Sequence, residues 1–233
     1  MPLCERSSAN LCVALSFLLA GMFSASTVGQ ELLPLRPEAT VYVHVSARDE
    51  LPGTALTALR TEATRIWARH RIMLAWGRDR PLSTDLRYAA VIPVIFDDRE
   101  MAKLPGHRDD DALARAVFIG RSQTVYVSVS RTLEMVRRLH AVGTELHDQG
   151  GRDVRTGTFL GRVVAHELGH ILLTSRAHAT TGLMRAMFVF RDLASGDDES
   201  IELTAADAER LAMRFSLPAL TPGTVLAQRR QVR

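Results

Sequence analysis

Residues 166–170 read His-Glu-Leu-Gly-His, which places two histidines four positions apart with a glutamate directly after the first. On an α-helix, such positions lie on one face about one turn apart, so both imidazoles can reach a single metal ion. Glu167 lies beside them and can accept a proton from a water molecule that the metal activates. These residue types at this spacing predict the active-site helix of a zinc hydrolase.

The residues that flank this motif favour a helix with one buried face. At about 100° per residue, four apolar side chains gather opposite His166 and His170. They are Val164, Leu168, Ile171 and Leu172. Gly169 lowers helix stability by about 1 kcal/mol relative to alanine, and its place beside the histidines predicts that a neighbouring segment approaches the helix closely. An ordinary surface helix with exposed histidines is the alternative that this pattern disfavours.

The composition is that of an ordinary globular protein. Of the 233 residues, 46% are hydrophobic and 24% are charged, which supports one domain of about 200 residues with a substantial core. The net charge is +3, and Lys103 is the one lysine among 29 basic residues. Because charges of both signs are scattered along the chain, the small positive excess gives little support to nucleic-acid binding, and we expect no nucleic-acid partner.

The first 26 residues differ from the rest of the chain. Residues 11–23 form an uncharged apolar run that follows Arg6 and precedes three small residues ending at Ser26. This order is typical of a secretory signal peptide, whereas a membrane span needs about 20 apolar residues. A buried first helix is the alternative. Cys4 and Cys12 both lie in this segment, so we expect bacterial-type export of a periplasmic or secreted chain, without disulfides and without a stable membrane span after cleavage.

Beyond the signal peptide at 1–26, we expect a connector over residues 27–40, one domain over 41–217 and a flexible tail over 218–233. Apolar periodicity within the domain predicts strands at 41–45, 72–76, 88–96, 116–120 and 124–130. It predicts helices at 54–70, 131–146 and 204–215, and a metal-binding helix from about 156–158 to about 173. Gly150 and Gly151 predict a loop over 149–156, and Pro93 predicts that its strand lies at a sheet edge or contains a bulge.

Two histidines do not complete a catalytic zinc site, which usually has three protein ligands and one open position. After the motif, the chain reads Ile-Leu-Leu-Thr-Ser-Arg-Ala-His-Ala-Thr-Thr-Gly-Leu-Met, ending at Met184. This segment resembles the metzincin metallopeptidases, in which H-E-x-x-H-x-x-G-x-x-H is followed by a methionine turn beneath the zinc. The resemblance makes Glu167 the general base and His166, His170 and His178 the zinc ligands. Met184 would belong to the methionine turn, with an ordinary core methionine as the alternative.

The spacing departs from the metzincin pattern. Leu173 and Arg176 stand where that pattern has glycine and histidine, and His178 comes two residues later. A helix that continues past Leu173 before the chain turns would account for the delay. A gluzincin-like site, in which Glu202 or Glu209 on a later helix is the third ligand, is the alternative.

The resemblance implies an α+β, zincin-like fold, with a twisted mixed sheet packed on helices and a metal-binding active-site helix. An edge strand would line the cleft and hold a peptide by strand addition, and residues 116–130 are the candidate for that edge. We therefore expect a secreted zinc-dependent peptidase that acts on peptides or proteins, with Glu167 as base. The alternatives are a non-catalytic zinc-binding interaction domain, which would not need Glu167, and a zinc hydrolase of a non-peptide amide.

Overall fold

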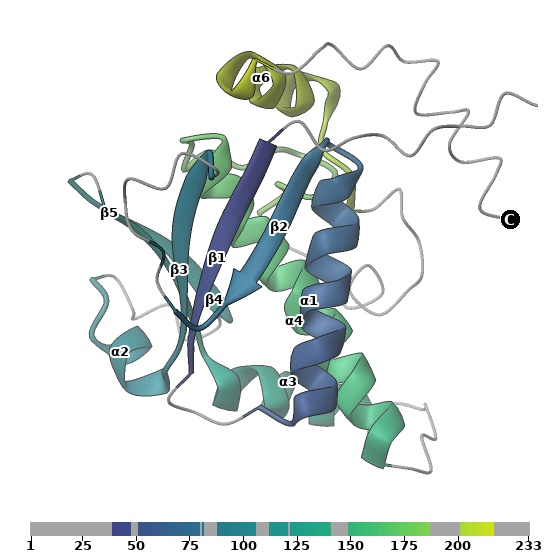
Figure 1. The fold of residues 1–233 in the computed structure, drawn as a ribbon. Coiled ribbons are helices and arrows are strands. Elements are labelled where there is room, and N and C mark those ends of the chain that lie inside the picture. The colour runs from purple at the N-terminus through teal and green to yellow at the C-terminus, as the bar shows by residue number, and fades with distance from the viewer. Residues whose placement is uncertain are drawn as a thin grey trace, which may run out of the picture. The chain divides into compact units, whose positions relative to one another are not determined.

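A mixed β-sheet of five strands forms the centre of the described structure (Figure 1). The computed structural model describes residues 39–47, 51–79, 81, 88–105, 112–120, 122–140, 149–186 and 201–216, all within the unit Leu35–Arg233. The expected signal peptide and the expected tail lie outside these residues. The strands are β1 (Ala39–Ala47), β2 (Ile72–Gly77), β3 (Ala90–Phe96), β4 (Ala114–Ile119) and β5 (Ser122–Val127).

The five strands are arranged in the order β2-β1-β3-β5-β4. β1 pairs in parallel with β2 and β3, and β3 pairs in parallel with β5, whereas β4 runs antiparallel to β5. In the register of β1, Val41 lies opposite Leu74 on one side and Ala90 on the other. β2 and β4 are therefore the edge strands of the described sheet. The mixed sheet with its helices confirms the predicted α+β class.

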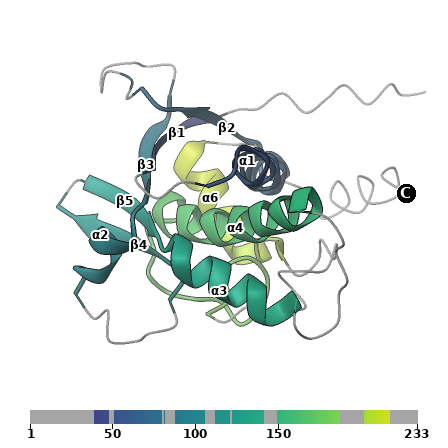
Figure 2. The same cartoon turned by 90° about the horizontal axis from the view of Figure 1, so that it is seen from below.

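The described helices are α1 (Gly53–Ala68), α2 (Asp98–Ala102), α3 (Val129–His140), α4 (Gln149–Leu172) and α6 (Ala205–Phe215). α1 and α4 pack side by side, and Figure 2 shows α1, α3 and α4 on the same side of the curved sheet. None of these helices is long and apolar enough to cross a bilayer. The helix that carries the histidine motif therefore lies beside α1 and also contacts β4 and β5.

The hydrophobic core lies between the sheet and these helices. Along β1, Val41, Val43 and Val45 are buried, and the residues between them are partly exposed. The alternation predicted for this strand is therefore confirmed. Trp67 of α1 and Phe96 of β3 are the largest fully buried side chains.

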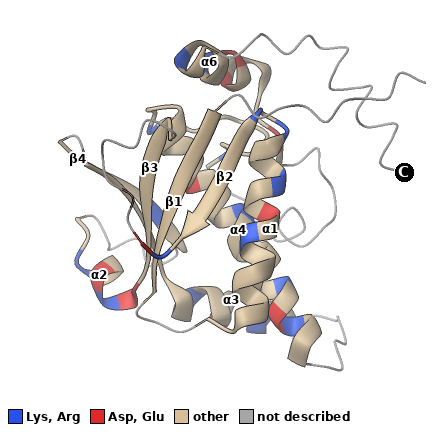
Figure 3. Cartoon of the chain, in the orientation of Figure 1, with Lys and Arg blue, Asp and Glu red and all other residues tan. Residues whose placement is uncertain are grey.

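Charged residues lie mainly on the helices (Figure 3). Four of the five strands contain no Lys, Arg, Asp or Glu, and β4 contributes Arg115 alone. On the helices, arginines lie beside acidic residues, as in the pairs Arg65–Glu62 and Arg138–Glu134. The described helices therefore mix both signs of charge, as the scattered charges of the sequence predict.

The helix that carries the histidine motif, α4, begins at Gln149, so the loop predicted over residues 149–156 is wrong. Contacts with α1 outweigh the low helix propensity of the glycines in α4. Asp153 accepts hydrogen bonds from Thr54 Oγ1 at 3.1 Å and from Gln149 Nε2 at 2.8 Å. Further along, a Cβ on Gly157 would lie 2.1 Å from the carbonyl oxygen of Ala55. Glycine at this position lets the two helices meet backbone to backbone.

β3 lies at the centre of the sheet, so the edge position predicted from Pro93 is wrong. The pairing of the strand explains how proline is tolerated there. Pro93 lies opposite His44 of β1, whereas pairing with β5 begins only at Val94. On the β5 side, no residue of the described sheet pairs with Pro93. The backbone N–H that proline lacks is therefore not needed for a ladder hydrogen bond on that side.

The other predicted elements are present with shifted ends. The turn between β4 and β5 is shorter than predicted, because Ile119 already pairs with Ser122. α3 begins at Val129, two residues earlier than expected, and the end predicted for it at 146 lies outside the described residues. α6 follows Thr204, whose hydroxyl accepts a hydrogen bond from the Asp207 N–H at 3.2 Å. This bond caps the first turn of α6, a helix that the sequence predicts over 204–215.

Candidate metal centre

Three histidines come together near the C-terminal end of α4. His166 and His170 belong to the helix, and His178 belongs to the segment that follows it. The ligand nitrogens of the three all lie within 4.8 Å of one another. The His178 ring stacks on the His166 ring, with centroids 5.4 Å apart and 14° between their planes, and meets the His170 ring nearly edge-on at 4.8 Å. These three side chains are therefore close enough to bind one metal ion.

The chain reaches His178 through a turn that ends α4. Thr174 adopts the left-handed conformation, with φ of 48°. The N–H of Ser175 donates to the carbonyl of His170 at 3.0 Å, and the N–H of Thr174 donates to that of Ile171 at 3.1 Å. These two bonds form a Schellman turn, which commonly has glycine at the left-handed position. That position comes one residue later than the glycine of the metzincin pattern, which accounts for part of the delay before His178.

Each of the two helix histidines is oriented by a backbone carbonyl. His166 Nδ1 lies 2.6 Å from the carbonyl oxygen of Leu183, and His170 Nδ1 lies 2.8 Å from that of Ser175. A carbonyl oxygen can only accept, so each Nδ1 carries the proton and each Nε2 keeps its lone pair. The two Nε2 atoms lie 3.1 Å apart. Two ligands of a tetrahedral zinc, each about 2.0–2.1 Å from the ion, are roughly 3.3 Å apart, so this pair fits a metal.

Burial keeps both helix histidines in the neutral form that binds metals. Loss of hydration lowers the pKa of His166 to about 4, although the hydrogen bond to Leu183 opposes this shift. Loss of hydration also lowers the pKa of His170, and the neighbouring His178 lowers it further. The lowered pKa of each imidazole means that protons compete less with a metal for either Nε2 atom.

Glu167 extends from α4 to the edge strand β4. Its Oε2 accepts a hydrogen bond from the N–H of Ala116 at 2.6 Å. Only 9% of the residue is exposed, and burial raises the pKa of its carboxyl group to about 7 against the opposing effects of the Ala116 N–H and of Arg115. A carboxyl group that titrates near neutrality can both accept and return a proton, as general acid–base catalysis requires.

Met184 lies directly against α4. It is only 2% exposed, and a Cβ on Gly169 would lie 2.3 Å from its Sδ. Glycine at this position therefore makes room for the side chain of Met184, and the close approach predicted from Gly169 is confirmed. The same segment is joined to the one that carries His178, since the Ala179 N–H donates to the Met184 carbonyl at 2.8 Å.

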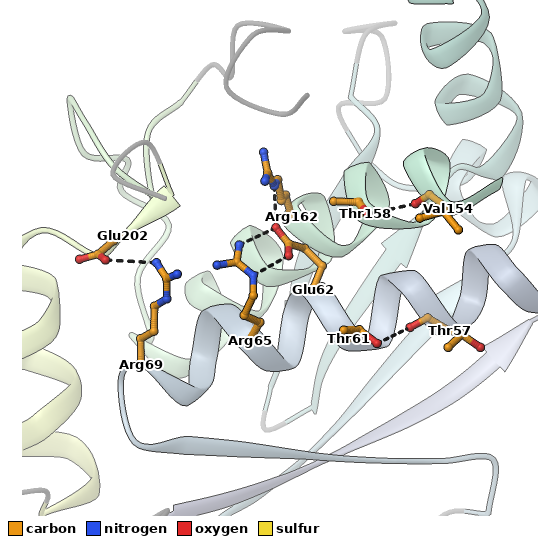
Figure 4. A network of polar contacts seen from close by, with 9 residues as sticks. All are labelled: Thr57, Thr61, Glu62, Arg65, Arg69, Val154, Thr158, Arg162 and Glu202. Carbon is orange, nitrogen blue, oxygen red and sulfur yellow. Dashed lines mark hydrogen bonds and ion pairs between the residues drawn. The ribbon is translucent and has the colours of Figure 1, made fainter. Parts of the chain in front are cut away.

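A partly buried ion-pair cluster joins α4 to α1 (Figure 4). Arg162, one turn before His166 and only 3% exposed, donates from Nε to Glu62 Oε1 at 2.7 Å. Arg65 donates to both oxygens of the same carboxylate, each at 2.8 Å. Burial acts to raise the pKa of Glu62, but the hydrogen bonds from Arg65 and Arg162 outweigh it and the pKa lies below its ordinary value. The charged cluster thus holds the turn of α4 that leads into the motif.

The end of α4 is capped by a side chain from α6. Arg214 Nη1 donates to the carbonyl oxygens of Ile171 and Leu172, at 2.7 and 2.8 Å. These carbonyls are among the last four of the helix, and the helix itself supplies no N–H donors to them. A guanidinium there also complements the negative end of the helix dipole. α6 therefore helps to fix the point from which the chain turns toward His178.

Neither of the alternative glutamate ligands belongs to the histidine group. Glu202 Oε1 lies 3.2 Å from Nη1 of Arg69 (Figure 4), and Glu209 is exposed on α6. Across the described ranges, the three histidines are the one group of three or more His, Cys, Asp or Glu side chains with metal-ligand spacing. The geometry therefore favours His178 over either glutamate as the third donor.

Several backbone groups at the site could not be found from the sequence. They are the carbonyls of Leu183 and Ser175, which orient the imidazoles, and the N–H of Ala116, which binds Glu167. Every residue except proline offers the same backbone groups, so only the folded chain shows which of them take part.

Comparison with known proteins does not assign the chain to a family. No protein-family model matches it, and no curated protein is significantly similar to it. Its function must therefore be argued from the geometry and chemistry of the site.

Proposed function

We propose that this protein is a zinc-dependent peptidase, with a metal held by His166, His170 and His178 and with Glu167 as general base. The observation that carries the proposal is the group of three imidazole nitrogens within 4.8 Å of one another beside a buried carboxyl group. Imidazole donors suit zinc, and three protein ligands leave one coordination position open, as in catalytic zinc sites. A structural zinc site would close that position with a fourth protein ligand.

The chemistry would be divided between the metal and the chain. A bound zinc ion lowers the pKa of a coordinated water and polarises a substrate carbonyl. Glu167 takes a proton as water attacks the carbonyl and passes it to the leaving amine. The Ala116 N–H holds one carboxylate oxygen of Glu167 at 2.6 Å, so that the other oxygen can receive the proton. The Leu183 carbonyl keeps His166 in the tautomer that presents Nε2.

The same proposal extends to a zincin-like fold in which β4 binds the substrate by strand addition. β4 is an edge strand, and its Ala116 N–H donates to Glu167 rather than to β5. Because backbone groups alternate sides along an antiparallel strand, those of Ala114 and Phe118 face the same way as those of Ala116. A peptide that pairs with this edge would bring its own backbone alongside Glu167.

The proposed enzyme would act outside the cytoplasm. The support is the apolar run at 11–23, followed by small residues, which is typical of a secretory leader. Peptides or proteins of the periplasm or of the surroundings of the cell would then be its substrates.

The proposal is tested by assaying metal-depleted and zinc-reconstituted protein on an unfolded protein and on small non-peptide amides. Cleavage of peptide bonds that is lost on chelation and returns with zinc supports it. Hydrolysis of the small amides alone would identify a hydrolase of another substrate class. Zinc binding without hydrolysis of either would identify a non-catalytic zinc-binding domain.

A further inference from the structure

The backbone of Leu183 is held on two sides. Its carbonyl oxygen lies 2.6 Å from His166 Nδ1, and its N–H donates to the carbonyl of Glu202 at 2.7 Å. Leu183 itself is fully buried. The orientation of the first histidine of the motif therefore depends, through one residue, on a segment that lies more than thirty residues further along the chain.

Gly182 is what allows the segment at 202 to come this close. Its φ is +73°, in the left-handed region that favours glycine. A Cβ at this position would lie 2.2 Å from the carbonyl oxygen of Glu202, which is the oxygen that accepts the Leu183 N–H. Any larger residue would have to move the Glu202 backbone or the Leu183 backbone, and either movement changes the bond to His166.

The segment 201–203 is anchored independently of the metal site. Ile201 is 1% exposed and Leu203 is 8% exposed, so both flanking side chains are in the core. Between them, Glu202 is joined to the end of α1 by its ion pair with Arg69 at 3.2 Å (Figure 4). A partly exposed pair of this kind contributes little to overall stability. It joins the residue whose carbonyl accepts the Leu183 N–H to the end of α1.

We propose that residues 201–203 are a positioning strut for the metal centre, with Gly182 and Glu202 acting through Leu183 on the His166 ring. Glu202, considered from the sequence as a metal ligand, would then serve the site without touching the metal. The inference rests on the proposed metal site, since it concerns the orientation of one of its ligands. Groups that orient a ligand typically change metal affinity by about 10–100-fold when they are lost.

The decisive variant is Gly182→Ala, and the chain offers a matched control in Gly120→Ala. Both glycines have left-handed backbones, with φ of +73° and +57°, but a Cβ on Gly120 would meet nothing within 4 Å. Both variants therefore introduce similar backbone strain, and only Gly182→Ala disturbs the strut. We expect zinc affinity, measured by competition with a chelator, to fall at least about tenfold in Gly182→Ala and to stay at the wild-type value in Gly120→Ala.

Two spectroscopic readouts separate positioning from a general loss of stability. In Gly182→Ala, the visible absorption bands of bound cobalt(II) should shift, and nitrogen NMR of the metal-free chain should show His166 no longer fixed with its proton on Nδ1. In Gly120→Ala, both signals should match the wild type. If Gly182→Ala gives the affinity and spectra of Gly120→Ala, the strut is overturned.

If Gly182→Ala does not fold, a second pair of variants with smaller structural changes tests the strut. Glu202→Ala should weaken zinc binding at least about threefold, whereas Glu209→Ala, which alters an exposed residue of α6, should not. Equal affinities in these two variants would overturn the strut. A wild-type chain that binds no zinc would instead overturn the proposed function, and the NMR comparison on metal-free protein would still test the strut.

Discussion

The N–H of Ala116 donates to Glu167 Oε2 at 2.6 Å, which joins the edge strand β4 to α4, the helix of the histidine motif, across 51 residues of sequence. The bond fixes the carboxyl group of Glu167 beside the edge strand β4. It also gives this buried carboxyl group a hydrogen-bond donor. A buried polar group without a partner would lower the stability of the folded chain. One hydrogen bond thus links the proposed base to the proposed substrate-binding strand.

The Glu167→Gln variant should keep the metal and lose hydrolysis. The amide has nearly the same shape and can accept the Ala116 hydrogen bond, but it cannot take up a proton from water. We expect zinc content to be unchanged and kcat/KM to fall at least about 100-fold. The control is Glu209→Gln on the exposed face of α6, which should retain full activity. Wild-type rates in Glu167→Gln would exclude this carboxylate as the base.

The same variant should change the pH dependence of stability in the metal-free protein. Burial raises the pKa of Glu167 to about 7 from an ordinary value of 4.5. The folded chain therefore holds this proton more tightly than the unfolded chain, so the associated stability is present below pH 4.5 and is lost as the pH rises to about 7. Denaturant unfolding should show Glu167→Gln stabilised by up to about 3 kcal/mol at pH 8.

That stabilisation should disappear in acid. Near pH 4, the wild-type carboxyl group is protonated in the folded chain, and the two proteins should have similar free energies of unfolding. A constant difference between pH 4 and pH 8 would show that the ionisation of Glu167 is not its cause.

The contact between α1 and α4 predicts opposite effects for two glycine-to-alanine changes. Gly157→Ala would place a Cβ 2.1 Å from the Ala55 carbonyl oxygen, a backbone atom that cannot move alone. We expect a loss of about 1–3 kcal/mol in the free energy of unfolding. Gly53→Ala, at the start of α1, meets nothing within 4 Å and should be neutral or stabilising by up to about 1 kcal/mol. Equal effects in denaturant unfolding would contradict the proposed backbone contact.

The histidine motif was predictable because its spacing is local. His166 and His170 lie one helical turn apart wherever residues 166–170 form a helix, so their shared face follows from the sequence alone. His178 could be selected as a candidate donor by residue type. Its approach to the other two histidines depends on the left-handed backbone at Thr174. Position 174 is neither glycine nor asparagine, so the sequence does not indicate this turn.

The errors in the predicted fold come from contacts between distant segments. The early start of α4 depends on packing against α1, where Gly157 contacts Ala55. The pattern of residues within one segment does not show a contact with a distant segment. The central place of Pro93 depends on β5 joining β3 only from Val94 onward. Local propensity gave the type of each element, whereas tertiary pairing decided its length and its place in the sheet.

X-ray absorption at the zinc edge, recorded on the zinc-reconstituted chain, tests the central claim most directly because it counts and identifies the ligands. We predict one zinc ion per chain, coordinated by three imidazole nitrogens and one further light atom at about 2.0–2.1 Å. In His178→Ala, one imidazole should be lost and zinc affinity should fall strongly. A wild-type chain that retains no zinc at neutral pH, or a site with two imidazoles and a carboxylate that is unchanged in His178→Ala, would contradict the proposed centre.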